Sequence, residues 1–110
     1  MSEHDNEFNV MAEQTIENLF DSIERELSHM AEVDLEGGIL NVELDDGRVY
    51  IINKHAPNRQ IWLSSPLSGA HHFSFDGGVG AWVSTRGSAQ LIAMLEDELT
   101  SINGGPVNLV

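Results

Sequence analysis

Four carboxylates between residues 13 and 24 are the side chains best suited to chemistry in this 110-residue chain. At 100° per residue of a helix, all four fall within about 80° of one another. We call them the acidic ridge, which consists of Glu13, Glu17, Asp21 and Glu24. Carboxylate oxygens suit hard cations such as Fe³⁺, Mn²⁺, Ca²⁺ and Mg²⁺. Because side chains strung along an exposed helix cannot close around one ion, we expect weak, multiple and poorly selective cation sites.

An ordinary solvated helix face is the alternative explanation of the ridge. Like charges three or four residues apart each destabilise a helix by about 0.2–0.5 kcal/mol, and Arg25 offsets only part of that repulsion. Glu43 and Asp45 could extend the negative surface onto a strand that follows the helix. The residue pattern by itself leaves the cation site and the solvated face open.

The distribution of charge along the chain indicates which kinds of molecule the protein can bind. The whole net charge of −13 comes from the first 46 residues, which hold fourteen acids and one base. Such a field attracts cations and basic protein surfaces and repels phosphate, so we expect neither nucleic acid nor a membrane as partner.

With no cysteine in the chain, any metal must be held by oxygen or imidazole. No apolar run reaches the ~18 residues of a membrane span, and we expect a bacterial cytoplasmic protein or, alternatively, a processed organellar protein.

A tryptophan in the middle of the chain marks a second candidate surface. Side chains alternate along a strand, so Ile61 and Leu63 should face the core while Gln60 and Trp62 face the other way. An outward tryptophan among polar neighbours is typical of an anchor for a protein partner. The alternative is an ordinary core residue, which we expect Trp82 to be.

The histidines and serines give no further site by their spacing. His71 and His72 are adjacent on a strand, so they face opposite ways and cannot share an ion. His4, between Glu3 and Asp5, could join a loose cation site. No serine has a histidine and an aspartate in the sequence context of a nucleophile.

Hydrophobic periodicity predicts the elements that hold these residues. Apolar residues recur every three or four positions over residues 6–30, which predicts a helix, and again from Leu91, after an expected N-cap at Ser88. Between the helices, alternating runs predict antiparallel strands near residues 40–44, 48–53, 59–64, 70–75 and 81–84. We therefore expect a single α+β domain over residues 1–110. Its two terminal helices should cover one face of a sheet of about five to six strands, and the other face should be exposed to solvent. Residues 107–110 should lie between the helices and cover the core.

One segment resembles a known family. From Asn53 to Pro66 the chain reads Asn-Lys-x-x-Pro-Asn-Arg-Gln-Ile-Trp-Leu-Ser-Ser-Pro, and Ser68-Gly69 follows. This pattern is similar to the signature of the frataxin/CyaY family, and closer to its mitochondrial branch than to its gamma-proteobacterial branch. The resemblance implies the two-layer sandwich that periodicity predicts.

The resemblance also implies roles for individual residues. In this family the first helix and the first strand edge bind Fe²⁺ and Fe³⁺ and face a cysteine desulfurase. The corresponding metal positions here are Glu13, Glu17, Asp21, Glu24, Glu43 and Asp45. The family's contacts with the desulfurase and the iron–sulfur scaffold protein correspond to Asn53, Gln60 and Trp62, and to His72 at a position that is often basic.

Three functions follow as hypotheses. The first is an iron-binding regulator, donor or sensor that acts on the desulfurase–scaffold complex, monomeric but able to oligomerise with iron. The second is a ferroxidase and iron-storage protein, although no Glu-x-x-His pair of the di-iron type is present. The third is an acidic adaptor for a basic protein, without metal.

Overall fold

The computed structural model of the protein describes residues 3–109, with the side chains of residues 5–109. The cation site considered around Glu3 and His4 lies outside these side chains. The elements follow in the order α1 (Glu3–Leu27), β1 (Ala31–Glu36), β2 (Ile39–Leu44), β3 (Val49–His55), η1 (Ala56–Asn58), β4 (Gln60–Ser65), β5 (Gly69–Asp76), β6 (Ala81–Ser84) and α2 (Leu91–Asn103). No helix within residues 3–109 is both long and apolar enough to cross a bilayer.

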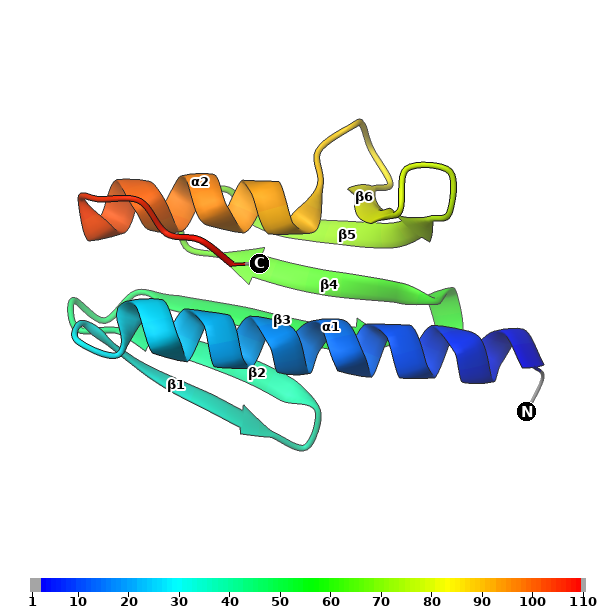
Figure 1. The fold of residues 1–110 in the computed structure, drawn as a ribbon, viewed down its shortest axis with the longest axis horizontal. Coiled ribbons are helices and arrows are strands. Elements are labelled where there is room, and N and C mark those ends of the chain that lie inside the picture. Colours follow the sequence, from blue (N-terminus) through cyan, green and yellow to red (C-terminus); the bar gives the residue numbers. More distant parts are fainter. Residues whose placement is uncertain (1–2, 110) are drawn as a thin grey trace.

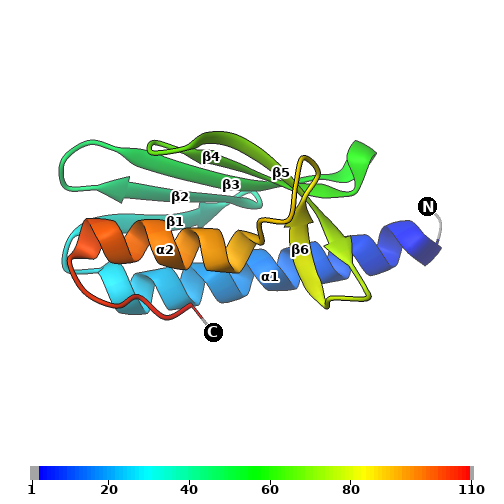
Figure 2. The same cartoon turned by 90° about the horizontal axis from the view of Figure 1, so that it is seen from above.

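The six strands form one antiparallel sheet in chain order, from β1 to β6. Both helices lie on the same side of this sheet, next to each other, and the opposite side carries no element (Figures 1 and 2). We call the helix side the inner face and the other side the outer face. The predicted two-layer α+β sandwich is therefore confirmed.

The core lies between the helices and the inner face. It is built from the apolar stripe of α1, alternate residues of the strands and one side of α2, including Ile16, Leu40, Ile61 and Leu95. The chain end runs between the two helices (Figure 1) and buries Val107 and Leu109, as expected for residues 107–109. Residue 110 is outside the described part.

Strand β1 was not predicted from the sequence. Its inner positions, such as Val33 and Leu35, are only half-buried, and its outer positions are all acidic, so its hydrophobic alternation is weak. Gly37 and Gly38 have φ of 60° and 79° and make a tight turn between β1 and β2, where we had expected only a chain break. Glycine adopts this left-handed backbone without steric cost.

The N-cap prediction for the second helix was wrong. Helix α2 begins at Leu91, and Gln90 occupies the N-cap position without a side-chain capping bond. Because Gln90 forms an antiparallel bridge with Val83 of β6, the chain stays extended beyond Ser88 and the helix starts later. The first helix also ends at Leu27, three residues before the expected Met30.

Candidate functional site

The acidic ridge is solvent-exposed along α1, as its spacing predicts. All four carboxylates are exposed, and Glu13 Oε2 lies 2.7 Å from Nζ of Lys54 on β3. Within residues 5–109, the other three make no hydrogen bond or ion pair: Glu17, Asp21 and Glu24. Arg25 donates a hydrogen bond from Nη2 to the carbonyl of Asn108 at 3.2 Å, so its guanidinium binds the C-terminal segment.

The ridge offers separate carboxylates and no closed metal shell. Among the side chains of residues 5–109, no three histidines, aspartates or glutamates converge where a single ion could sit. Oxygen ligands from one or two side chains leave most of a cation's coordination to water. The geometry therefore suits several loosely held ions along the helix.

The remaining predicted metal residues lie away from α1. Glu43 points to the outer face of β2, directly opposite Glu32 of β1, whereas α1 lies on the inner face. Asp45 follows β2 and is exposed, and its backbone N–H donates to the carbonyl of Met30 at 2.9 Å. With Asp34 and Glu36, the Glu32–Glu43 pair makes a second negative zone on the outer face, at the β1 edge.

Trp62 lies on the outer face at the centre of a three-ring stack. His55 covers one side of the indole, with centroids 3.7 Å apart and planes 9° from parallel. His72 covers the other side at 4.3 Å and 10°. The indole N–H donates to Oε1 of Gln60 at 2.8 Å. We call His55, Trp62 and His72 the aromatic stack.

The strand register explains how the stack forms. Trp62 of β4 is paired with Asn53 of β3 and with His72 of β5, so these three predicted docking residues share one row. Gln60, the fourth, is paired with His55. Sequence reasoning missed His55, although its position two residues after Asn53 places it on the same face.

The outward placement of Trp62 is confirmed, but its ring is not free. Ile61 and Leu63 are buried, and Trp62 is half-buried. Because both ring faces and the N–H are occupied, only the edge of the indole is open to a partner. The same face exposes Ile39 and Ile51, which add apolar area beside Asn53.

A partly buried hydrogen-bond network on the inner face was also missed. Oε1 of Glu98 on α2 accepts hydrogen bonds from Tyr50 Oη at 2.7 Å and from Ser65 Oγ at 2.6 Å. Its Oε2 accepts one from Ser68 Oγ at 2.6 Å. Ser65 and Ser68 belong to the signature segment, so this network fixes the turn after β4 to α2.

Burial and hydrogen bonding shift two groups of this network. Burial raises the pKa of Glu98, but the hydrogen bonds from Ser65, Ser68 and Tyr50 outweigh it and hold the pKa below its ordinary value. Burial, together with the bond to Glu98, raises the pKa of Tyr50. Glu98 is therefore a carboxylate and Tyr50 a neutral phenol near neutral pH.

Ser68 also contacts a histidine, but in an order that does not activate it. Nε2 of His71 lies 2.9 Å from Ser68 Oγ, while the hydroxyl proton points to Glu98. In a catalytic triad the histidine lies between the serine and the acid and takes the serine's proton. Here the serine lies between them, so the cluster has the features of a structural network.

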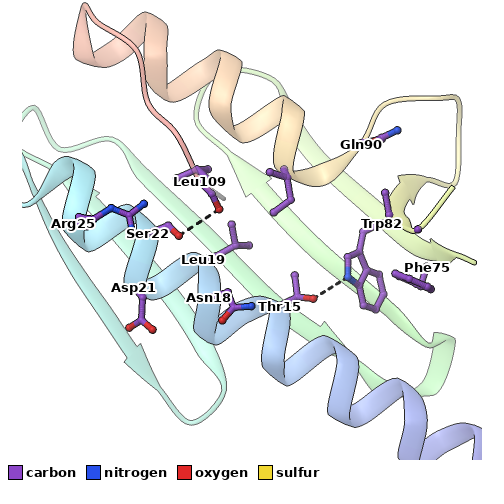
Figure 3. Close-up of a pocket in the computed structure, with 13 residues that line it drawn as sticks. Thr15, Asn18, Leu19, Asp21, Ser22, Arg25, Phe75, Trp82, Gln90 and Leu109 are labelled. Carbon is purple, nitrogen blue, oxygen red and sulfur yellow. Dashed lines mark hydrogen bonds between the residues drawn. The ribbon is translucent and has the colours of Figure 1, made fainter.

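A groove of about 560 Å³ runs between α1, β6 and the start of α2. Figure 3 shows Trp82 on its floor, with Nε1 donating to Oγ1 of Thr15 at 3.0 Å, and Phe75 beside it. Trp82 is buried, as expected for a core residue. Ser22 donates to the carbonyl of Leu109 at the other end (Figure 3). The lining is mainly apolar and places no cluster of titratable groups over the floor.

Comparison with known proteins gives consistent matches. The family described as "Frataxin-like domain" matches residues 1–105. The chain is 36% identical over 107 residues to the mitochondrial frataxin of Arabidopsis thaliana, covering 94% of this chain and 57% of that protein. It is 39% identical over 93 residues to the mitochondrial frataxin homolog of Saccharomyces cerevisiae, covering 80% and 52%. The chain thus spans a little over half the length of these curated relatives.

Solved structures agree with the fold. Trimeric yeast frataxin complexed with ferrous iron superposes with a TM-score of 0.73 at 36% identity, over 82% of each chain. Frataxin from Psychromonas ingrahamii also gives 0.73, over 96% of this chain and 97% of that chain. At 24% identity, this second likeness shows the fold alone. The matched domain, the identities and the shared architecture show that this chain belongs to the frataxin family.

Proposed function

We propose that this protein binds Fe²⁺ and Fe³⁺ on the acidic ridge and serves iron–sulfur cluster assembly. The observation that carries the proposal is the row of exposed carboxylates on α1 that have no partner among residues 5–109, namely Glu17, Asp21 and Glu24. The yeast relative complexed with ferrous iron supports the choice of metal. Weakly held ions exchange quickly, which suits delivery or sensing of iron better than storage.

The partner proposed for the outer face is a cysteine desulfurase with its iron–sulfur scaffold protein. Asn53, Trp62 and His72 form one cross-strand row, Gln60 fixes the indole, and the neighbouring isoleucines add apolar contact. The second negative zone at the β1 edge complements basic protein surface. Docking would regulate sulfur transfer while the ridge on the other side stays open to iron.

Location and assembly state are part of the same proposal. The names of the relatives from Arabidopsis and yeast place them in mitochondria, which supports the mitochondrial matrix over the bacterial cytoplasm. The yeast trimer supports oligomerisation, and we propose that the monomer assembles when iron neutralises the ridge.

A two-dimensional ¹H–¹⁵N NMR titration under anaerobic conditions tests both surfaces. Added Fe²⁺ should broaden signals from Glu13 to Glu24, and the desulfurase–scaffold complex should shift signals around Asn53 to Trp62. If iron leaves the ridge signals unchanged, the metal part of the proposal fails. If the partner complex leaves the outer face unchanged, the docking part fails.

Two other functions give different results in simple assays. A ferroxidase, for which the iron-complexed yeast trimer is the favouring observation, would consume O₂ with Fe²⁺ faster than buffer alone. A metal-independent adaptor would bind the desulfurase equally well in the presence of a chelator and show no iron-induced broadening. The dispersed carboxylates favour binding without turnover, because defined oxidation requires ligands that converge.

A further inference from the structure

The contact between Lys54 and Glu13 joins the family signature to the acidic ridge. Lys54 Nζ lies 2.7 Å from Glu13 Oε2, and the two side chains are 26% and 61% exposed. Lys54 is paired with the fully buried Ile61, which places it on the inner face beside α1. The ammonium therefore sits on one end of the ridge with most of its stem covered.

The surroundings of this ammonium are acidic and open. A cavity of about 470 Å³ lies between α1 and the turn that joins β1 to β2. Its charged lining consists of Glu13, Glu17 and Lys54, and Gly37 and Gly38 leave one wall without side chains. Both partners reach the surface, so the ion pair itself is open to solvent.

We propose that Lys54 is a tethered counter-cation that competes with metal for Glu13 and so weakens metal binding at this end of the ridge. The inference rests on the proposed iron binding. In the resting protein the ammonium neutralises Glu13, and iron binds first around Glu17, Asp21 and Glu24. Iron gains the Glu13 carboxylate only when it displaces Lys54, so any change that removes this positive charge should raise the affinity.

A second ion pair supplies a matched control. Arg59 Nε lies 2.9 Å from Asp5 Oδ1, so another base of the signature also reaches α1. Asp5 lies eight residues before Glu13, about 12 Å along the helix axis. This exceeds the Debye length of about 8–10 Å at physiological salt. Arg59→Gln therefore changes the net charge by the same amount as Lys54→Gln but leaves Glu13 paired.

The experiment compares Fe²⁺ affinities by anaerobic isothermal titration calorimetry in four variants and the unchanged protein. Exposed ion pairs are weak, so Lys54→Gln should tighten binding about two- to fivefold, beyond any change in Arg59→Gln. Lys54→Arg should behave like the unchanged protein. Adding Glu13→Gln to Lys54→Gln should abolish the gain, because the released ligand is then gone. Circular dichroism verifies that each variant is folded.

A measurement without metal distinguishes failure of the Lys54 competition from failure of the proposed iron binding. The side-chain carboxyl ¹³C signal of Glu13 should move in Lys54→Gln and stay in place in Arg59→Gln. Equal Fe²⁺ affinities for Lys54→Gln and Arg59→Gln would overturn the competition while leaving iron binding intact. If Fe²⁺ binds no variant although the Glu13 signal moves, then the ion pair exists but the proposed iron function is wrong, and the competition fails with it.

Discussion

Trp62 and His72 are cross-strand partners whose rings stack 4.3 Å apart, with planes only 10° from parallel. His55 repeats this arrangement on the other side of the indole, so rings from three neighbouring strands form one column. Cross-strand ring pairs stabilise a sheet and restrict the motion of each ring. The proposed docking residue is therefore held in one orientation before any partner arrives, which lowers the entropy lost on binding.

Replacing Trp62 with alanine should separate docking from folding. Two stacked pairs at about 0.5–1.5 kcal/mol each give an expected loss of about 1–3 kcal/mol in the free energy of unfolding, measured in urea. The same variant should abolish the effect of the protein on desulfurase turnover but keep its iron binding. Leu67→Ala, which removes an exposed apolar side chain in the next turn, serves as control and should leave turnover unaffected. Regulation that survives Trp62→Ala would contradict docking through the stack.

Neutralising the middle of the ridge should raise stability and lower iron affinity together. The double variant Glu17→Gln and Asp21→Asn removes the like-charge pairs formed with Glu13, Glu24 and each other. At about 0.2–0.5 kcal/mol per pair, the free energy of unfolding should rise by about 0.5–1.5 kcal/mol. Urea unfolding and calorimetric titration with Fe²⁺ measure both effects. Unchanged stability would show that water already screens the ridge.

Asp97→Asn is the control for the loss of one acidic charge away from the ridge. Asp97 is exposed on α2 and has no hydrogen bond or ion pair within residues 5–109. It should alter neither stability nor iron affinity beyond the effect of net charge.

Glu98→Gln should destabilise the protein more than its partial exposure suggests. The neutral amide accepts no charge-assisted hydrogen bond, has one acceptor oxygen instead of two, and turns N–H donors toward hydroxyls that now donate to the carboxylate. An unsatisfied buried group costs about 1–3 kcal/mol, and Tyr50 is 1% exposed. We expect a loss of this size in the free energy of unfolding. A loss no larger than that of Asp97→Asn would contradict a role of the network in stability.

The low pKa of Glu98 gives this loss a pH dependence. A carboxyl whose pKa is lower in the folded state stabilises the protein above its unfolded pKa, near 4.5, and loses this contribution as the pH falls through its folded value. The stability difference between the unchanged protein and Glu98→Gln should therefore be largest above about pH 5 and shrink below about pH 4. Urea midpoints between pH 7 and pH 3 measure it, and a difference independent of pH would contradict the assigned ionisation.

Residue periodicity predicted the helices and five of the strands because their buried faces are strongly apolar. Strand β1 was not predicted, because its inner side chains are only half-buried and acidic residues occupy its other face. The ridge was predicted because it depends only on spacing within one helix. The aromatic stack and the Glu98 network depend on strand register and on how α2 lies over the sheet, and neither can be derived from spacing within one element. His55, for example, becomes part of the stack only once Asn53 is known to face Trp62.

Asn53 and Lys54 are neighbours in β3, yet one lies in the docking row and the other reaches the ridge. Adjacent side chains of a strand always leave on opposite sides. Inserting or deleting a single residue before this pair would exchange the faces of the sheet on which the two side chains lie. The amide of Asn53 would then face α1, and the ammonium of Lys54 would lie on the outer face, where the partner is proposed to dock. Changes of chain length by one residue should therefore be far more harmful in this strand than conservative substitutions, and a second residue inserted beside the first should restore both surfaces.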